Sequence, residues 1–107
     1  MPKFLIEATY SAEGLKGLQK EKASGRKEAV TKAVEGLGGK LEAFYYSLGD
    51  YDVVLIVDMP DLISGTAMAV KISATGLVRT KTTPLLSIEE VDRALSKTVE
   101  YRPPGGQ

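Results

Sequence analysis

Residues 45–61, which read YYSLGDYDVVLIVDMPD, decide the fold of this 107-residue chain. Their centre, Val53–Val57, is an unbroken apolar run, and Pro60 follows shortly after it. A short apolar run that is rich in β-branched residues and is stopped by a proline predicts a strand with neighbours on both sides. The glycine and aspartates before the run predict a turn, so residues 40–48 and 53–59 are expected to form a β-hairpin.

Two further strands are predicted, one on each side of this hairpin in the sequence. The segment 3–10 alternates in character and places four residues on one face: Phe4, Ile6, Ala8 and Tyr10. The segment 77–86, LVRTKTTPLL, is rich in β-branched residues. Alternation and β-branching are both typical of strands, so the chain is expected to contain four.

Helices are predicted between these strands. Apolar residues at helical spacing indicate a helix that is broken near residues 23–26 and ended by Gly38 and Gly39. A second helix is expected after Asp61, whose side chain can cap it. The sequence SIEE at 87–90 matches a capping box and predicts a short carboxy-terminal helix.

The resulting order, β-α-β-β-α-β with an added helix, predicts an α+β, ferredoxin-like domain. In this topology the antiparallel sheet has the strand order 4-1-3-2, and the two main helices cover one face. We expect residues 1–100 to form this single domain and residues 101–107 to be a flexible tail.

One face of the central strand stays uncovered in such a fold. Successive side chains of a strand point to opposite faces, so either the set containing Val53 or the set containing Val54 meets the helices. The other set forms an apolar patch larger than soluble monomers usually expose. We therefore expect a homo-oligomer in which a second copy packs sheet against sheet, as in dimeric α/β-barrels, with a cavity between the sheets.

The composition argues against several kinds of function. The chain has 14 basic and 14 acidic residues and no Cys or His, so it lacks a thiol nucleophile, thiolate metal ligands and the commonest general base. Its balanced charge gives no field that would attract nucleic acid or an anionic membrane, and we expect neither as a partner. The residues at the amino end include no long apolar segment. We expect a cytoplasmic protein without a cofactor or a bound metal.

The turn before the apolar strand consists of Gly49, Asp50, Tyr51 and Asp52. Two carboxylates and a phenol at a cavity mouth could bind a cation or a polar ligand. The alternative is a structural turn in which Gly49 supplies an unusual dihedral angle, an aspartate caps the turn and Tyr51 packs on an adjacent strand. Turn chemistry accounts for these residue types by itself, and we favour the structural alternative.

A second group of residues is predicted to gather on the uncovered face of the sheet. The first and last strands are neighbours, so Glu7 is expected near Arg79 and Lys81, with Tyr46 from the second strand lining the same space. Arg79 could hold a carboxylate or phosphate of a small molecule with two hydrogen bonds. The alternative, which we favour, is that Arg79 pairs with Glu7 or with a charge on a second subunit and fixes how the two sheets align.

These segments also resemble the GYD family, which is named for a Gly-x-Tyr-Asp turn, matched here by Gly49–Asp52. The resemblance rests on FYYSLGDYDVVLIVDMPD and GLVRTKT, together with TYSAEGLKGLQ and LGGKLEAFYYSLG, and it covers about residues 3–86. The segment from Ser87 onward lies outside it. The resemblance implies a ferredoxin-like relative of the dimeric α/β-barrels and implies no catalytic motif.

Three functions stay open on this basis. The first is a non-enzymatic protein that self-associates through its sheet and binds a small molecule there, which requires none of the missing residue types. The second is a cofactorless oxygenase or isomerase in which Tyr46, Arg79 and Glu7 act on the substrate. The third is an interaction module whose apolar sheet face contacts a different protein.

Overall fold

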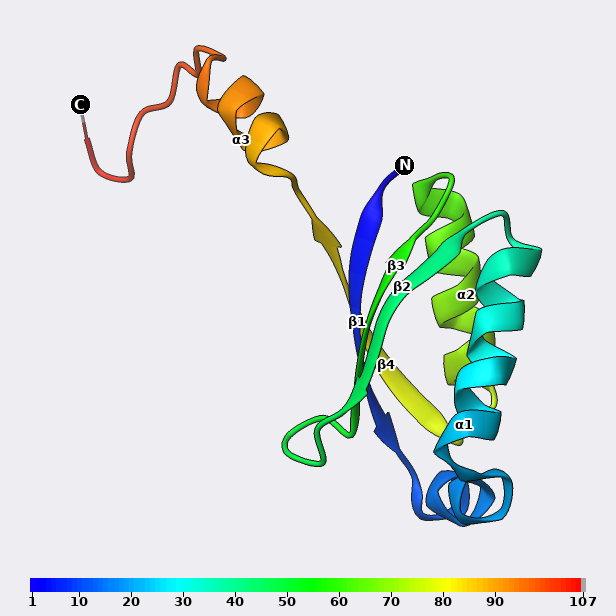
Figure 1. The fold of residues 1–107 in the computed structure, drawn as a ribbon. Coiled ribbons are helices and arrows are strands. Elements are labelled where there is room, and N and C mark those ends of the chain that lie inside the picture. Colours follow the sequence, from blue (N-terminus) through cyan, green and yellow to red (C-terminus); the bar gives the residue numbers. More distant parts are fainter. Residues whose placement is uncertain (107) are drawn as a thin grey trace.

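The computed structural model describes residues 1–106, and its elements follow the predicted order. They are β1 (Lys3–Tyr10), α1 (Ala12–Gly36), β2 (Lys40–Tyr46), β3 (Val53–Asp58), α2 (Leu62–Ala74), β4 (Val78–Leu85) and α3 (Ile88–Leu95). The strands form one antiparallel sheet in the order β2-β3-β1-β4, with α1 and α2 on one face (Figure 1). The predicted α+β, ferredoxin-like fold is therefore confirmed.

The core lies between the sheet and these two helices. Alternate residues of β1 and β3 contribute to it: Phe4, Ile6, Ala8, Val53, Leu55 and Val57. Val34 of α1, Met68 of α2 and Met59 complete it. The set containing Val53 thus faces the helices, whereas Val54 and Ile56 point to the other side and are only half-buried.

The first helix, α1, is bent at Lys22, whose backbone φ of 69° is not helical. Positive φ is strained for a residue with a side chain, and the nearby Gly25 also weakens the helix. The break predicted near residues 23–26 is therefore present, one residue earlier. After the last residue of α1, Gly38 has a φ of 81° and adopts the left-handed conformation that a helix end favours.

The predicted amino-terminal caps of α2 and α3 are both present. The Asp61 carboxylate accepts a hydrogen bond from the Ser64 N–H at 2.7 Å. The Ser87 hydroxyl accepts from the Glu90 N–H at 3.1 Å, and the Glu90 carboxylate accepts from the Ser87 N–H at 2.8 Å. These backbone hydrogen bonds lower the pKa of Asp61 and of Glu90 because they stabilise the charged carboxylate. Both helices therefore begin at well-defined residues.

The second strand, β2, contains an irregularity that simple alternation does not predict. Its pairing with β3 shifts in register between Leu41 and Ala43, as in a β-bulge. Leu41 pairs with Val57 and Phe44 with Leu55, so both lie on the side that the helices cover. Strict alternation along residues 40–48 would place Leu41 and Phe44 on opposite faces, but the extra residue in the bulge reverses the face of the residues that follow it.

The third helix, α3, extends away from the sheet (Figure 1), and none of its residues is buried. The expected tail, 101–107, is described as far as Gly106 and contains a turn closed by a hydrogen bond from the Gly106 N–H to the Pro103 carbonyl at 3.0 Å. Residue 107 lies outside the described part. Within residues 1–106 no helix combines the length and the apolar character needed to cross a membrane.

Gly14→Ala is expected to destabilise the fold, because Gly14 packs against the loop before β4. A Cβ at this position would overlap the carbonyl oxygen of Leu77, which also accepts a hydrogen bond from the Ser11 N–H at 2.9 Å. We expect the free energy of unfolding to fall by about 1–3 kcal/mol in urea denaturation.

The control is Gly17→Ala, about one turn further along α1, where a Cβ would meet nothing within 4 Å. This change is expected to leave stability unchanged or to raise it by up to about 1 kcal/mol, because alanine favours the helix. Equal losses in the two variants would show that the contact with Leu77 does not position α1.

Candidate functional site

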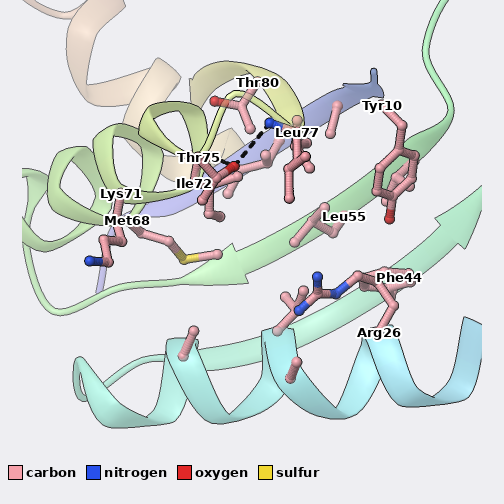
Figure 2. Close-up of a pocket in the computed structure, with 17 residues that line it drawn as sticks. Tyr10, Arg26, Phe44, Leu55, Met68, Lys71, Ile72, Thr75, Leu77 and Thr80 are labelled. Carbon is pink, nitrogen blue, oxygen red and sulfur yellow. Dashed lines mark hydrogen bonds between the residues drawn. The ribbon is translucent and has the colours of Figure 1, made fainter. Parts of the chain in front are cut away.

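A cavity lies at the centre of the helix-covered face, between α1 and α2 (Figure 2). Its volume is about 220 Å³. It exists because α1 packs mainly on β2 and α2 on β4, so that the helices do not pack closely against each other. The short side chains of Ala29 and Ala33 on α1 leave additional space. The sheet contributes an apolar lining from Ile6, Ala8, Phe44, Val53, Leu55 and Val78.

The charged groups of this cavity are cationic. Arg26 lies shortly after the bend in α1, and its guanidinium points into the cavity (Figure 2). Its Nε is 3.2 Å from the Glu21 carboxylate but lacks hydrogen-bond geometry, so this nitrogen is buried without a hydrogen-bond partner. Lys71 of α2 also lines the cavity. No carboxylate is among the described residues that line the cavity, but Glu21 beside it forms an ion pair with Arg26 and offsets part of the positive charge.

Tyr10, at the end of β1, lines the same cavity, and Tyr46 of β2 is close to it. Burial raises the pKa of the Tyr10 hydroxyl, and the neighbouring Tyr46 hydroxyl raises it further. No hydrogen bond of ordinary geometry joins the two, and the Tyr46 hydroxyl is buried without a partner. The Tyr46 ring contacts Phe44 edge to face, with 5.4 Å between ring centroids. Tyr10 is therefore a neutral hydrogen-bonding group at physiological pH and a poor acid or base.

Two hydroxyl groups in the wall already have partners within the protein. Thr75 Oγ1 accepts a hydrogen bond from the Leu77 N–H at 3.1 Å, drawn dashed in Figure 2, and donates to the Ile72 carbonyl at 2.7 Å. Thr80 Oγ1 is 3.2 Å from Ser73 Oγ. Arg26, Lys71 and Tyr10 are thus the lining groups best suited to meet a polar part of a bound molecule. The arrangement fits a small apolar molecule that carries one anionic group.

The opposite side of the sheet, which α1 and α2 leave uncovered, is a second candidate surface that we call the open face. Its outward residues, taken from the strand pairing, are Lys3, Leu5, Glu7, Thr9, Lys40, Ala43, Tyr45, Val54, Ile56, Asp58, Arg79, Lys81, Thr83 and Leu85. Leu5 pairs with Ile56 at its centre, which is apolar. At one end Lys3 binds Asp58 at 2.8 Å and also binds Glu42, and both carboxylates raise the pKa of Lys3. An apolar centre with charges around it is the usual composition of a protein interface.

The predicted open-face residues are brought together only in part. Glu7 pairs directly with Lys81, and Arg79 pairs with Thr9. None of the three charged side chains has an ion-pair partner within 4.0 Å among residues 1–106, so the predicted Arg79–Glu7 pair does not form within the chain. The placement of Tyr46 on this face is wrong. Tyr46 pairs with Val53 and shares its orientation toward the helices, which puts the thickness of the sheet between it and Arg79.

The Gly49–Asp52 turn is held by hydrogen bonds within the protein. The Ser47 N–H donates to the Asp52 carbonyl at 2.9 Å, and the Gly49 N–H donates to the Tyr51 carbonyl at 3.0 Å. The Asp52 carboxylate accepts a hydrogen bond from the Tyr10 N–H at 2.9 Å, so it binds β1 and does not cap the turn itself. The unusual dihedral angle expected at Gly49 is found at Leu48, whose φ is 52°. Asp50 and Tyr51 remain available at the surface as exposed and half-buried residues.

Comparison with known protein families gives one match, since the profile of the GYD domain matches residues 4–95. The chain belongs to the GYD domain family. The match covers most of the 107 residues and extends to the last residue of α3, Leu95, beyond the stretch 3–86 on which the sequence resemblance rests. Searches of curated proteins and of solved structures find no significant match. The family match thus includes α3 and names no ligand or activity.

The cavity of this GYD domain is the site that the sequence analysis missed. Its main polar group, Arg26, lies in a segment rich in bases that reads as a solvated helix surface, and Ala29 and Ala33 read as ordinary helix residues. The useful signal was the pair of small residues one turn apart on the inner side of α1, next to an arginine.

Residues 1–106 hold no cluster of three or more acidic side chains that would suit a metal ion.

The raised pKa of Tyr10 predicts a loss of stability at alkaline pH. Because the folded-state pKa lies above the ordinary value of 10.0, the contribution of this group is fully present below pH 10.0 and is lost as the pH rises beyond it. We expect Tyr10→Phe to flatten this decline in the free energy of unfolding, measured by urea denaturation across the alkaline range. Tyr45→Phe, at an exposed tyrosine of the open face, should leave the decline unchanged. Identical alkaline profiles for wild type and Tyr10→Phe would refute the assignment.

Proposed function

We propose that this GYD-domain protein binds a small, largely apolar anion in the cavity between its helices and its sheet. The observation that carries the proposal is the guanidinium of Arg26, which points into an apolar cavity (Figure 2) and whose Nε is buried without a hydrogen bond, although it forms an ion pair with Glu21 at 3.2 Å. A buried donor without an acceptor is costly to the fold, by about 1–3 kcal/mol. An anionic oxygen of a ligand would remove this cost and would share the guanidinium with Glu21, whose carboxylate already forms an ion pair with it.

The dimensions of the cavity support a ligand of modest size. A volume of about 220 Å³ is somewhat below the range of about 300–1,000 Å³ that is typical of small-molecule sites. Its lining by Leu55, Val53 and Phe44 favours an apolar body, and Tyr10 offers a neutral hydrogen bond. A carboxylic acid with a short aliphatic or single aromatic group satisfies all of these features.

Binding is better supported than catalysis. Within the described chain the lining offers two cations and a phenol with a raised pKa, and none of these accepts a proton readily near neutral pH. The set proposed for a cofactorless enzyme is divided, because Tyr46 lies on the helix side of the sheet while Arg79 and Glu7 lie on the open face. The fold therefore gives these three residues no common substrate.

We also propose that the protein self-associates through its open face. Leu5, Ile56 and Val54 form an apolar centre there, and the surrounding Glu7, Lys81 and Arg79 lack partners within the described chain. Packing against a second copy would remove the apolar centre from water and offer each charge an opposite charge across the interface. A different protein as the partner is the alternative that a monomeric chain would favour.

The binding proposal is tested by isothermal titration calorimetry with benzoate, a carboxylate with a single aromatic ring that has the size and charge expected of the ligand. We expect the native protein to bind it, and Arg26→Gln to weaken binding by about tenfold or more, as loss of a hydrogen bond to a charged group predicts. Lys27→Gln, which removes the adjacent exposed cation, is the matched control and should bind as the wild type does.

The same experiment includes Ala33→Leu, which fills the cavity from α1. We expect this variant to lose binding while its thermal stability is retained or raised, because it fills space without disturbing the sheet. If benzoate does not bind the wild type, or binds Ala33→Leu and Arg26→Gln as strongly as it binds the wild type, the cavity is a packing defect and the proposal fails.

Self-association is tested by sedimentation velocity. The wild type is expected at twice the chain mass of 11.5 kDa or at a higher even multiple. Ile56→Lys places a charge at the apolar centre of the open face and should shift the protein toward the monomer with an unchanged circular dichroism spectrum. Thr66→Lys adds the same charge on α2 at an exposed position on the helix side and should not. A monomeric wild type would exclude this part of the proposal.

A further inference from the structure

The surface left unexplained by the cavity and the open face is the apolar side of α3. Ile88, Val91 and Leu95 are spaced so that they lie on one side of this helix, and they are 82%, 38% and 77% exposed. The chain after the helix adds Val99 and Tyr101, both also largely exposed. A helix with one apolar side normally buries that side, so α3 lacks the surface that it is built to contact.

The connection between β4 and α3 is short. Leu86 alone separates the end of β4 from Ser87, the helix cap, and the reciprocal hydrogen bonds between Ser87 and Glu90 hold the first turn. The helix continues beyond the sheet and makes no packed interface with another element of the described chain. The radius of gyration is consequently 17.2 Å, whereas a compact chain of this length has about 13 Å. In this arrangement α3 cannot cover its own sheet.

The projection of α3 places it where a second copy would be. Figure 1 shows α3 beyond the end of β4, on the side of the sheet opposite to α1 and α2. This is the side of the open face, through which the proposed self-association occurs. A second copy on the open face would therefore lie beside α3, with the apolar side of the helix available to it.

The size of the open face indicates that it needs such an addition. Four strands spaced about 4.8 Å apart, with about six paired residues rising about 3.3 Å each, give a projected area of roughly 400 Å². Side-chain relief increases the accessible area, but a stable interface buries about 800 Å² on each partner. The five exposed apolar side chains of α3 and the segment after it can supply the remainder.

The charges of the two surfaces are complementary. Asp92 lies beside the apolar side of α3, and it has no ion-pair partner within residues 1–106. Arg79 and Lys81 are exposed on the open-face side of β4, equally without partners in the part of the chain that is described. The carboxylate of Asp92 on the helix and the basic side chains of Arg79 and Lys81 on the sheet would attract each other between two copies.

From these observations we propose that α3 is a dimerisation arm, whose apolar side docks on the open-face side of a second copy, next to the second copy's Arg79 and Lys81. Two arms related by a twofold axis would each cover the other copy, giving a closed dimer. This inference rests on the proposed self-association through the open face and adds that the sheet alone is insufficient for it.

The test is the double variant Ile88→Ser/Leu95→Ser, studied by sedimentation velocity over a range of concentrations. Both side chains are exposed in the single chain, so the variant should fold as the wild type does, which circular dichroism and thermal unfolding of the dilute monomer would verify. We expect the dimer dissociation constant to rise by about 100-fold, as loss of two apolar contacts predicts. Arg93→Ser, on the opposite side of α3, is the control and should dimerise normally.

Isotope-filtered nuclear Overhauser measurements on a mixture of labelled and unlabelled wild-type chains locate the arm. Contacts between the methyl groups of Ile88 or Leu95 and sheet residues of the other copy are expected. A wild type that remains monomeric would overturn both the self-association and the arm. A dimer that the double variant leaves intact, or contacts of α3 within its own chain alone, would overturn the arm and leave the sheet-mediated dimer standing.

Discussion

The structure depends on the packing of helices against only one face of a four-stranded sheet. Phe4, Ile6 and Leu55 point to that face, and the alternation of side chains along each strand sends their neighbours Leu5 and Ile56 to the other. A strand that is apolar throughout therefore stabilises the monomer core and at the same time creates a surface that water solvates poorly. The proposed partner on the open face would contact side chains of the same strands that hold the fold together.

The cavity has an equally simple origin. Each main helix covers one edge of the sheet, α1 over β2 and α2 over β4, so the centre of the sheet is covered by side chains that reach across from the two sides. Where those side chains are the methyl groups of Ala29 and Ala33, the space stays open, and the bend at Lys22 brings Arg26 to its border. The cavity and the open face thus occupy opposite sides of the same strands, and a ligand on one side need not compete with a subunit on the other.

The fold was predictable because its signals are local. Alternation, glycine stops and the caps at Asp61 and Ser87 each involve only a few residues of sequence, and each is present as expected. The site was less predictable because it depends on which face a residue occupies over a long strand. The bulge after Leu41 reverses the face of the residues that follow it, and the sequence of β2 contains no clear signal for a bulge. Simple alternation therefore predicts the wrong side of the sheet for Tyr46. The cavity depends on how far apart two helices lie, which alternation and helical periodicity do not encode.

The hydrogen bonds of Asp52 give the family's characteristic turn a structural meaning. The Asp52 N–H donates to the Ala8 carbonyl at 2.8 Å, and the Asp52 carboxylate accepts from the Tyr10 N–H at 2.9 Å. This single residue therefore satisfies two successive backbone hydrogen-bonding groups of β1 on the edge toward β3. The Asp52 side chain takes the place of the next backbone hydrogen bond between β1 and β3. It continues the pairing of β1 beyond Val53, where the backbone preceding β3 turns away from β1. Ala8 and Tyr10 are both in the cavity wall. The Gly49–Asp52 turn therefore stabilises one wall of the cavity, although none of its own residues lines the cavity.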